Sequence, residues 1–269
     1  MAGSLLSRAF GALELLANHP QGIALQDVAD SLNIPKSAAH RLLASLVEYG
    51  YVRQDTASAH YMLTMRLLTV ALGFLARSGI NDIAQPLMDR LATSTGELVR
   101  LSVIEGDPPN QSQVWVGKAQ GAQQGLRYDP DMGRAAPLSC TSTGFAWLAC
   151  LSDEDALQLV SRQGIALGPE LGRNAPRTLK EVLSCIELAR ERGYAMVTDC
   201  SEPGLAAIAT AVKHPVTKAV IGVLSVSGPS ARLTEERMQA LAPELLKTAE
   251  ELGLGYQNSS LFGGRARSH

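Results

Sequence analysis

The sequence predicts an α+β protein in two parts, a small helical unit with one hairpin and a larger unit built around one sheet. Near the N-terminus, two short apolar-striped helices are separated by a proline and followed by a strand–turn–strand pattern. Beyond residue 97, strand patterns are grouped with helices around one sheet, which favours α+β over a doubly wound parallel sheet. A length of 269 residues suits two domains.

Three helices are expected in the first 50 residues. Residues 5–17 should form the first, because apolar side chains recur there at helical spacing: Leu6, Phe10, Leu13, Leu16 and Ala17. Pro35 separates the other two, since proline disfavours helix at the residue before it and fits the first turn of a new helix. Gly50 ends the third helix. The side chains expected to point inward from it are Ala38, Ala39, Leu42, Leu43, Leu46 and Val47.

The opposite face of this third helix carries short or cationic side chains: Lys36, Ser37, His40, Arg41, Ala44, Ser45 and Glu48. Although the chain has a formal net charge of −2, no acidic residue stands between Ser31 and Val47. Such side chains reach phosphates and base edges when a helix lies in the major groove of DNA. From this segment alone, an ordinary helical hairpin with a solvated face remains the alternative.

The residues that follow favour DNA binding. Residues 51–54 and 61–63 have the pattern of two strands around a turn at 55–59. A helix, a helix-turn-helix and a hairpin in this order form a winged helix-turn-helix, predicted over residues 1–64. The expected DNA contacts are Lys36, Ser37, His40 and Arg41 in the recognition helix and Arg53 in the wing, on the phosphate backbone.

Residues 65–79 are expected to form a linker helix, followed by a second domain over residues 80–257. The linker is too apolar for a flexible tether. It should therefore pack, either against its twin in a dimer, around Leu68, Leu72 and Leu75, or within the core of the first domain. The small number of cations in the DNA-binding face favours a dimer, because one unit alone would bind weakly at physiological salt.

The second domain should alternate strands, turns and helices. Its expected strands are 98–104, 113–118, 124–128, 205–212 and 220–227. Its expected helices are 80–95, 142–151, 153–163, 179–192 and 234–252. The tail over residues 258–269 is expected to be disordered.

Polar residues in apolar surroundings indicate a binding site in this domain. Residues 139–144 open a helix, where free N–H groups can bind an anion, although Ser and Thr also cap helices without any ligand. Ser225 and Ser227 share one face of the last strand. If that face is buried, the two hydroxyls need a ligand, a water molecule or each other; if it is outward, they carry no meaning.

Composition restricts the remaining possibilities. The four cysteines, Cys140, Cys150, Cys185 and Cys200, form no CxxC pair, so neither a metal site nor a disulfide framework is expected, and the location should be a reducing cytoplasm. No stretch approaches the ~20 apolar residues of a membrane helix. Arg8 and Glu14 make the N-terminal segment unlike a signal peptide. No cofactor is indicated.

Two other classes of function are compatible with parts of the sequence, a hydrolase and an architectural DNA-binding protein. A hydrolase could use Ser139, Ser142 or Cys140 as nucleophile, but His214 is the one plausible base and no GxSxG motif occurs. The chain is therefore not expected to be an enzyme. An architectural DNA-binding protein would have no use for a second domain of this size.

Six segments in this order resemble the IclR family of transcriptional regulators: SRAFGALELLA, PKSAAHRLLASLVEYGYV, YMLTMRLLTVALG, GRAAPLSCTSTGFAWLA, ERGYAMVTDCSEPG and GVLSVSGPSARL. The resemblance implies a winged helix-turn-helix followed by a GAF-like effector-binding domain. It also implies homodimers or homotetramers on palindromic operator DNA, usually of catabolic operons, with a small and often aromatic organic acid as effector.

The resemblance also places the effector contacts. They fall on Ser142, Thr143, Ser225 and Ser227, with Leu126 and Tyr128 on the pocket wall, and Met132 is expected to line the pocket as well. Ala207 stands where the family often has a cysteine, and Val197 where it often has an aspartate, with Asp199 close by but not aligned. These changes imply a more apolar pocket. Because none of these contact positions is an Arg or Lys, the effector carboxylate is expected to be held by hydrogen bonds and the helix dipole.

Overall fold

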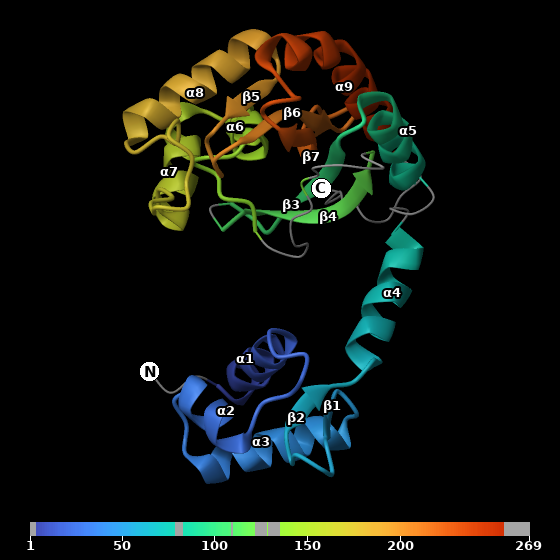
Figure 1. Cartoon of the computed structure of the whole chain (residues 1–269), viewed down its shortest axis with the longest axis vertical. Coiled ribbons are helices and arrows are strands. Elements are labelled where there is room, and N and C mark those ends of the chain that lie inside the picture. Colours follow the sequence, from blue (N-terminus) through green and yellow to red (C-terminus); the bar gives the residue numbers. More distant parts are fainter. Residues whose placement is uncertain (1–3, 79–82, 109, 122–127, 129–134, 256–269) are drawn as a thin grey trace, which may run out of the picture. The chain divides into compact units, whose positions relative to one another are not determined.

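The computed structural model describes residues 4–78, 83–108, 110–121, 128 and 135–255, without the side chains of 75–78. The chain divides into two compact units, residues 1–76 and 77–269. In the first, three helices precede an antiparallel hairpin and a further helix (Figure 1). Their bounds are α1 Leu5–Ala17, α2 Leu25–Ser31, α3 Lys36–Glu48, β1 Val52–Gln54, β2 Tyr61–Leu63 and α4 Arg66–Ser78. This arrangement confirms the predicted winged helix-turn-helix.

The core of the first unit lies between α1, α2, α3 and the hairpin. Leu42, Leu43 and Leu46 of α3 are buried in it, but Val47 is 40% exposed, so its predicted inward position is wrong. At about 100° per residue, Val47 lies beyond Leu43 at the edge of the buried arc. In α1, Leu6 and Phe10 are exposed.

The apolar side chains of α4 are solvent-exposed in the single chain, which disfavours placing this helix in the core of the first unit. Those described, with Met65 just before the helix, are between 38% and 74% exposed: Met65, Leu67, Leu68, Val70, Leu72 and Phe74. Exposed apolar residues that gather on one element are typical of an interaction surface.

The second unit is a five-stranded antiparallel sheet in the order β4-β3-β7-β6-β5. Its strands are β3 Leu98–Glu105, β4 Ser112–Gln120, β5 Ala195–Thr198, β6 Leu205–Lys213 and β7 Val220–Pro229. Its helices are α5 Gln85–Thr95, α6 Ser142–Leu148, α7 Asp153–Gln163, α8 Leu179–Arg192 and α9 Glu235–Gly255. One core forms with α5 and α9, and a second with α6, α7 and α8 (Figure 1). This α+β architecture is that expected of a GAF-like domain.

The strands of the second unit differ from the sequence expectation in two places. β5 was not expected, and it forms because Ala195–Thr198 pairs with Ala206–Ala209 at the edge of the sheet. The expected strand at 124–128 lies outside the described residues except for Tyr128, which belongs to no strand. The tail from residue 258 also lies outside them.

A β-bulge in β4 decides which side chains reach each face of the sheet. Leu101 pairs with Gly117 and Ser102 with Trp115, so Val116 is an extra residue without an opposite partner. Gly117 packs against Met88 of α5. In a regular strand Trp115 would share that face, because side chains alternate. The bulge turns it, with Gln113, toward the face of Arg100 and Ser102 instead.

Candidate functional site

The exposed face of α3 is the candidate DNA-binding surface. Lys36, Ser37, His40 and Arg41 are all exposed, as is Arg53 on β1 of the same unit. Among the described residues, neither Lys36 nor Arg41 forms an ion pair with a carboxylate. Their charges are therefore available to an external anion such as a phosphate.

The tip of the wing is held by one carboxylate. Asp55 accepts hydrogen bonds at Oδ2 from the backbone N–H and the hydroxyl of Ser58, both at 2.8 Å, and from the N–H of Ala57 at 3.2 Å. The hydrogen bonds from Ser58 are the main reason why the pKa of Asp55 lies below its ordinary value. The turn that follows Arg53 therefore has a defined shape in which Asp55 is charged at neutral pH.

The four polar residues predicted as effector contacts are all buried in the second unit. Ser225 and Ser227 are 1% and 2% exposed, and Ser142 and Thr143 are 3% and 2% exposed. Gln113 Nε2 donates to the carbonyl oxygen of Thr143 at 3.3 Å, so the start of α6 lies against this face of the sheet. The alternative that the serines face outward is therefore wrong.

The other predicted contacts are only partly described. Ala207 is buried and pairs with Ser227 across β6 and β7, while Val197 on β5 pairs with Ala207. Tyr128 is half-buried, and its hydroxyl donates to Glu202 Oε1 at 2.9 Å. Leu126 and Met132 lie outside the described residues.

Sequence reasoning missed Arg100. It lies on β3 directly opposite Ser225 and is only 6% exposed. Its guanidinium carbon stands 4.0 Å from the centre of the Trp115 ring and 5.6 Å from that of Tyr128. Burial lowers the pKa of Arg100, while nearby Tyr128 and Glu202 act in the opposite direction. An arginine keeps its charge even so, and this part of the sheet therefore holds a buried cation.

Five buried side-chain atoms in the described part of the chain have no hydrogen-bond partner, and all five lie on this face: Arg100 Nε, Arg100 Nη1, Gln113 Oε1, Trp115 Nε1 and Ser227 Oγ. We call Arg100, Gln113, Trp115, Ser225 and Ser227 the polar cluster. Buried polar groups without partners are rare and destabilising, and they call for an explanation. Their convergence on one patch indicates a ligand-binding surface.

The polar cluster places Arg100 beside the predicted effector contacts, none of which is an Arg or Lys. The start of α6 is a weaker anion site than expected, because the helix has only seven residues. Thr141 caps it by accepting the N–H of Gly144 at 3.0 Å, and the Thr141 hydroxyl donates to Pro137 O at 2.6 Å. Arg100 is thus the main positive charge of this surface.

The residues considered for nucleophilic catalysis are not arranged for it. Burial raises the pKa of Cys140 to about 11, which keeps the thiol protonated at neutral pH. Ser139 accepts the N–H of Ala166 at 2.9 Å. His214 Nδ1 accepts the N–H groups of Val216 and Thr217, both at 3.1 Å, within its own turn. The described residues also contain no His, Cys, Asp and Glu group that could hold a metal ion.

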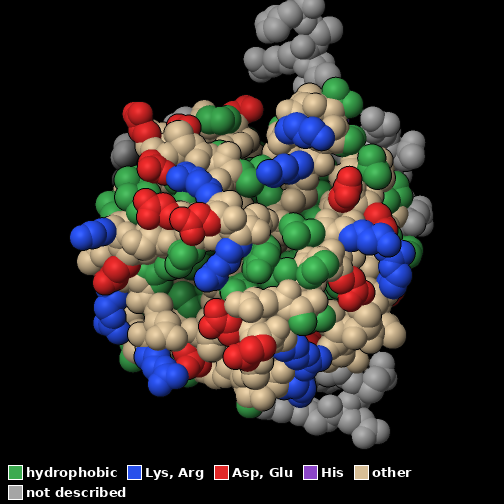
Figure 2. Space-filling model, turned by 90° about the horizontal axis from the view of Figure 1, so that it is seen from above, with side chains coloured by type: hydrophobic (Ala, Val, Ile, Leu, Met, Phe, Trp, Pro, Cys, Tyr) green, Lys and Arg blue, Asp and Glu red, His purple; other side chains and the backbone are tan. Residues whose placement is uncertain are grey.

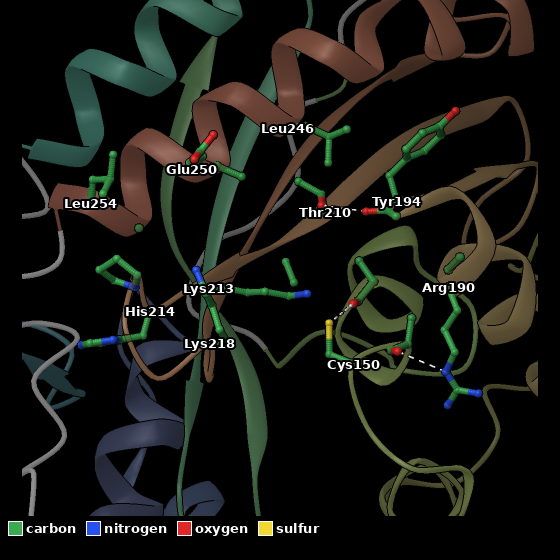
Figure 3. A pocket seen from close by; sticks show the side chains of 18 residues that line it. Cys150, Arg190, Tyr194, Thr210, Lys213, His214, Lys218, Leu246, Glu250 and Leu254 are labelled. Carbon is green, nitrogen blue, oxygen red and sulfur yellow. Dashed lines mark hydrogen bonds between the residues drawn. The ribbon is translucent and has the colours of Figure 1, made fainter.

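A cavity of about 460 Å³ lies elsewhere, between α6, α8, α9 and the end of β6 (Figure 3). Lys213 extends into it, whereas Arg190 is occupied by the carbonyls of Ala149 and Leu151 and by Asp153. None of the predicted effector contacts lines this cavity. On the face of the molecule seen in Figure 2, basic and acidic side chains are intermingled. Among the described residues, no helix is long and apolar enough to cross a membrane.

Sequence comparisons match both units. A family described as "IclR helix-turn-helix domain" matches residues 5–56, and one described as "Bacterial transcriptional regulator IclR C-terminal" matches residues 73–254. The chain is 28% identical over 251 residues to the acetate operon repressor of Salmonella typhimurium, covering 93% of this chain and 89% of that protein. It is 27% identical over 253 residues, with the same coverage, to the transcriptional repressor IclR of Escherichia coli.

A solved structure shares the fold. An IclR homolog from Microbacterium hydrocarbonoxydans, complexed with 4-hydroxybenzoate, superposes with a TM-score of 0.77 at 20% identity, covering 95% of this chain and 100% of that one. The curated relatives are transcriptional repressors, and this chain is a transcriptional regulator and not an enzyme. With family matches over both of its units, the chain belongs to the IclR family of bacterial transcriptional regulators.

Proposed function

We propose that this regulator controls a catabolic operon in the cytoplasm by binding palindromic operator DNA as a homodimer or homotetramer, and that a small organic acid changes this binding. The exposed cations of α3, with no acidic residue from Ser31 to Val47, support the DNA contact, and the exposed apolar residues of α4 support the assembly. The observation that carries the effector assignment is the buried Arg100, whose Nε and Nη1 have no partner.

The DNA contact rests on Lys36 and Arg41 of α3, with Ser37 and His40 beside them and Arg53 on the backbone. Operator fragments selected from genomic DNA provide the probe. Arg41→Ala should weaken specific binding by about 1–3 kcal/mol if Arg41 reads a base, and Lys36→Ala should reduce the salt dependence. Lys213→Ala removes the same charge from the second unit and is the matched control. Operator affinity unchanged in both α3 variants would contradict the assignment.

The effector is proposed to be an anion because Arg100 is a buried cation with two unpartnered nitrogen atoms. Burying a charge costs several kcal/mol, and a carboxylate that binds the unpartnered Nε and Nη1 of Arg100 would offset part of this cost. Ser227 Oγ also lacks a partner, and Ser225 makes only a long bond of 3.4 Å to Arg100 O. Both hydroxyls can donate to carboxylate oxygens. The homologous structure that holds 4-hydroxybenzoate supports the same class of ligand.

Matched acids and amides test the charge requirement. In thermal-shift titrations, benzoate should stabilise the wild-type protein more than benzamide does, because a ligand that binds the folded state raises its stability by mass action. Arg100→Met should abolish this difference, and Ser227→Ala should reduce it. Lys213→Met removes a cation from the separate 460 Å³ cavity and should leave it intact. If instead Lys213→Met loses the difference between benzoate and benzamide and Arg100→Met keeps it, the effector binds in that cavity.

The signal is proposed to pass through α4, which joins the two units along the chain. A ligand that prefers one arrangement of the effector domains shifts the population of the assembly toward it. The linker helices would then change the spacing of the recognition helices. An architectural DNA-binding protein would show no such response to any acid.

A further inference from the structure

We propose that the effector carries a hydroxyl group in addition to its carboxylate, and that Gln113 and Trp115 recognise this hydroxyl. The chemical class is then a hydroxycarboxylate. This inference rests on the proposed effector site, and it comes from the two unpartnered atoms that an anion alone would not satisfy, Gln113 Oε1 and Trp115 Nε1.

The orientation of the Gln113 amide is fixed by its neighbours. Its Nε2 donates to Ser102 Oγ at 2.8 Å and to the carbonyl oxygen of Thr143 at 3.3 Å. A carbonyl can only accept, so the nitrogen must be on that side. Ser102 Oγ in turn donates to Val223 O at 3.2 Å. Gln113 Oε1 therefore remains as an acceptor that requires an external donor.

Trp115 has an unpartnered donor, where Gln113 has an unpartnered acceptor. Its Nε1–H is a donor only, and it is buried without an acceptor. Trp115 and Gln113 are two residues apart on the bulged strand, which places them on one face about 7 Å apart along the backbone. A ligand that binds between them meets a donor from one side chain and an acceptor from the other.

A single ligand hydroxyl can satisfy both atoms, because its oxygen accepts from Trp115 and its hydrogen is donated to Gln113. A carbonyl would leave Gln113 Oε1 unpaired, and an ammonium would leave Trp115 Nε1 unpaired. The ammonium would also stand close to Arg100, whose guanidinium stacks on the same indole ring at 4.0 Å. The face therefore selects an acid at Arg100 and Ser227 and a hydroxyl at Gln113 and Trp115.

Calorimetric titrations with three matched pairs test this inference: 4-hydroxybenzoate and benzoate, mandelate and phenylacetate, lactate and propionate. In at least one pair the hydroxy acid should bind about tenfold more tightly, as expected for two hydrogen bonds to otherwise unpaired groups. Trp115→Phe keeps an aromatic ring over Arg100 but removes the Nε1–H. It should lower this preference severalfold, whereas Lys213→Met, which lies outside the polar cluster, should keep the wild-type preference.

Gln113→Met is the second variant, and it should lower the same preference by removing the acceptor. If hydroxy and plain acids bind equally while Arg100→Met abolishes binding of both, the hydroxyl inference is overturned and the proposed effector site stands. A preference that survives both Trp115→Phe and Gln113→Met would likewise overturn it. If no acid binds, or if Arg100→Met binds them all normally, the proposed effector site itself fails, and the inference fails with it.

Discussion

Arg100 occupies a position that favours ligand binding at the expense of the ligand-free fold. Its side chain is buried on β3, and two of its nitrogen atoms have no partner. Removing a buried charge whose polar atoms lack partners should stabilise the ligand-free protein, because the desolvation of such a charge is costly. Without ligand, we therefore expect Arg100→Met to unfold at higher urea concentration than the wild type, with an unchanged dependence on denaturant.

Arg90→Met is the control for this measurement. Arg90 lies 57% exposed on α5, in an ion pair with Glu251, and its loss should not raise stability. A lower urea midpoint for Arg100→Met would mean that the guanidinium already has a partner in the ligand-free protein, and would contradict our description of the polar cluster.

Single residues also show where sequence reasoning ends. Ser225 and Ser227 could be found because they alternate with apolar residues in one strand, a local pattern. Arg100 could not be recognised in the same way, since an arginine within a strand is usually solvated. It becomes a site residue only through its pairing with Ser225, 125 residues further along the chain.

Among the elements, the bulge in β4 determines the composition of the polar cluster. A one-residue insertion reverses which side chains face each side of a strand. The sequence around Trp115 alternates as an ordinary strand would, so the bulge is visible only in the register with β3. Long helices were predictable from their period, whereas the four-residue β5 depends on its pairing with β6.

The turn before α9 and the start of that helix are attached to the sheet by a buried carboxylate. Glu97 has a side chain only 2% exposed, and it accepts bonds from Arg232 Nε at 2.6 Å and Nη2 at 2.8 Å. Arg237 approaches the same carboxylate at 3.5 Å. We expect Glu97→Gln to lower the free energy of unfolding by about 2–3 kcal/mol, less than for fully buried pairs because Arg232 can be rehydrated.

Urea unfolding of Glu97→Gln measures this loss, and Glu191→Gln on the exposed surface of α8 serves as its control. The control should lie within about 0.5 kcal/mol of the wild type. If both variants unfold alike, Glu97 does not hold α9 to the sheet as the hydrogen bonds indicate.

For the whole molecule, the exposed apolar residues of α1 and α4 call for a partner. Leu5, Leu6 and Phe10 of α1 are 62–72% exposed, and Leu68 and Leu72 of α4 are about half exposed. We expect the double variant Leu68→Glu/Leu72→Glu to be monomeric in light scattering, because charges disfavour burial of this surface in an interface. It should also bind a full operator no better than a half-site.

Leu167→Glu is the matched control, since it places the same charge on an exposed leucine of the second unit. It should keep the wild-type mass and operator affinity. A double variant of α4 that remains a dimer would show that the subunits meet through another surface.

The most direct test of the central claim measures operator affinity by fluorescence anisotropy, with and without effector, for the wild type and for Arg100→Met. The operator comes from the DNA selection, and the effector is the acid that binds most tightly in the titrations. Our account predicts that the effector changes the affinity of the wild type by at least about tenfold, a coupling of about 1.4 kcal/mol. Arg100→Met should bind the operator with wild-type affinity, and the effector should not change that affinity. A full effector response in Arg100→Met would contradict the account.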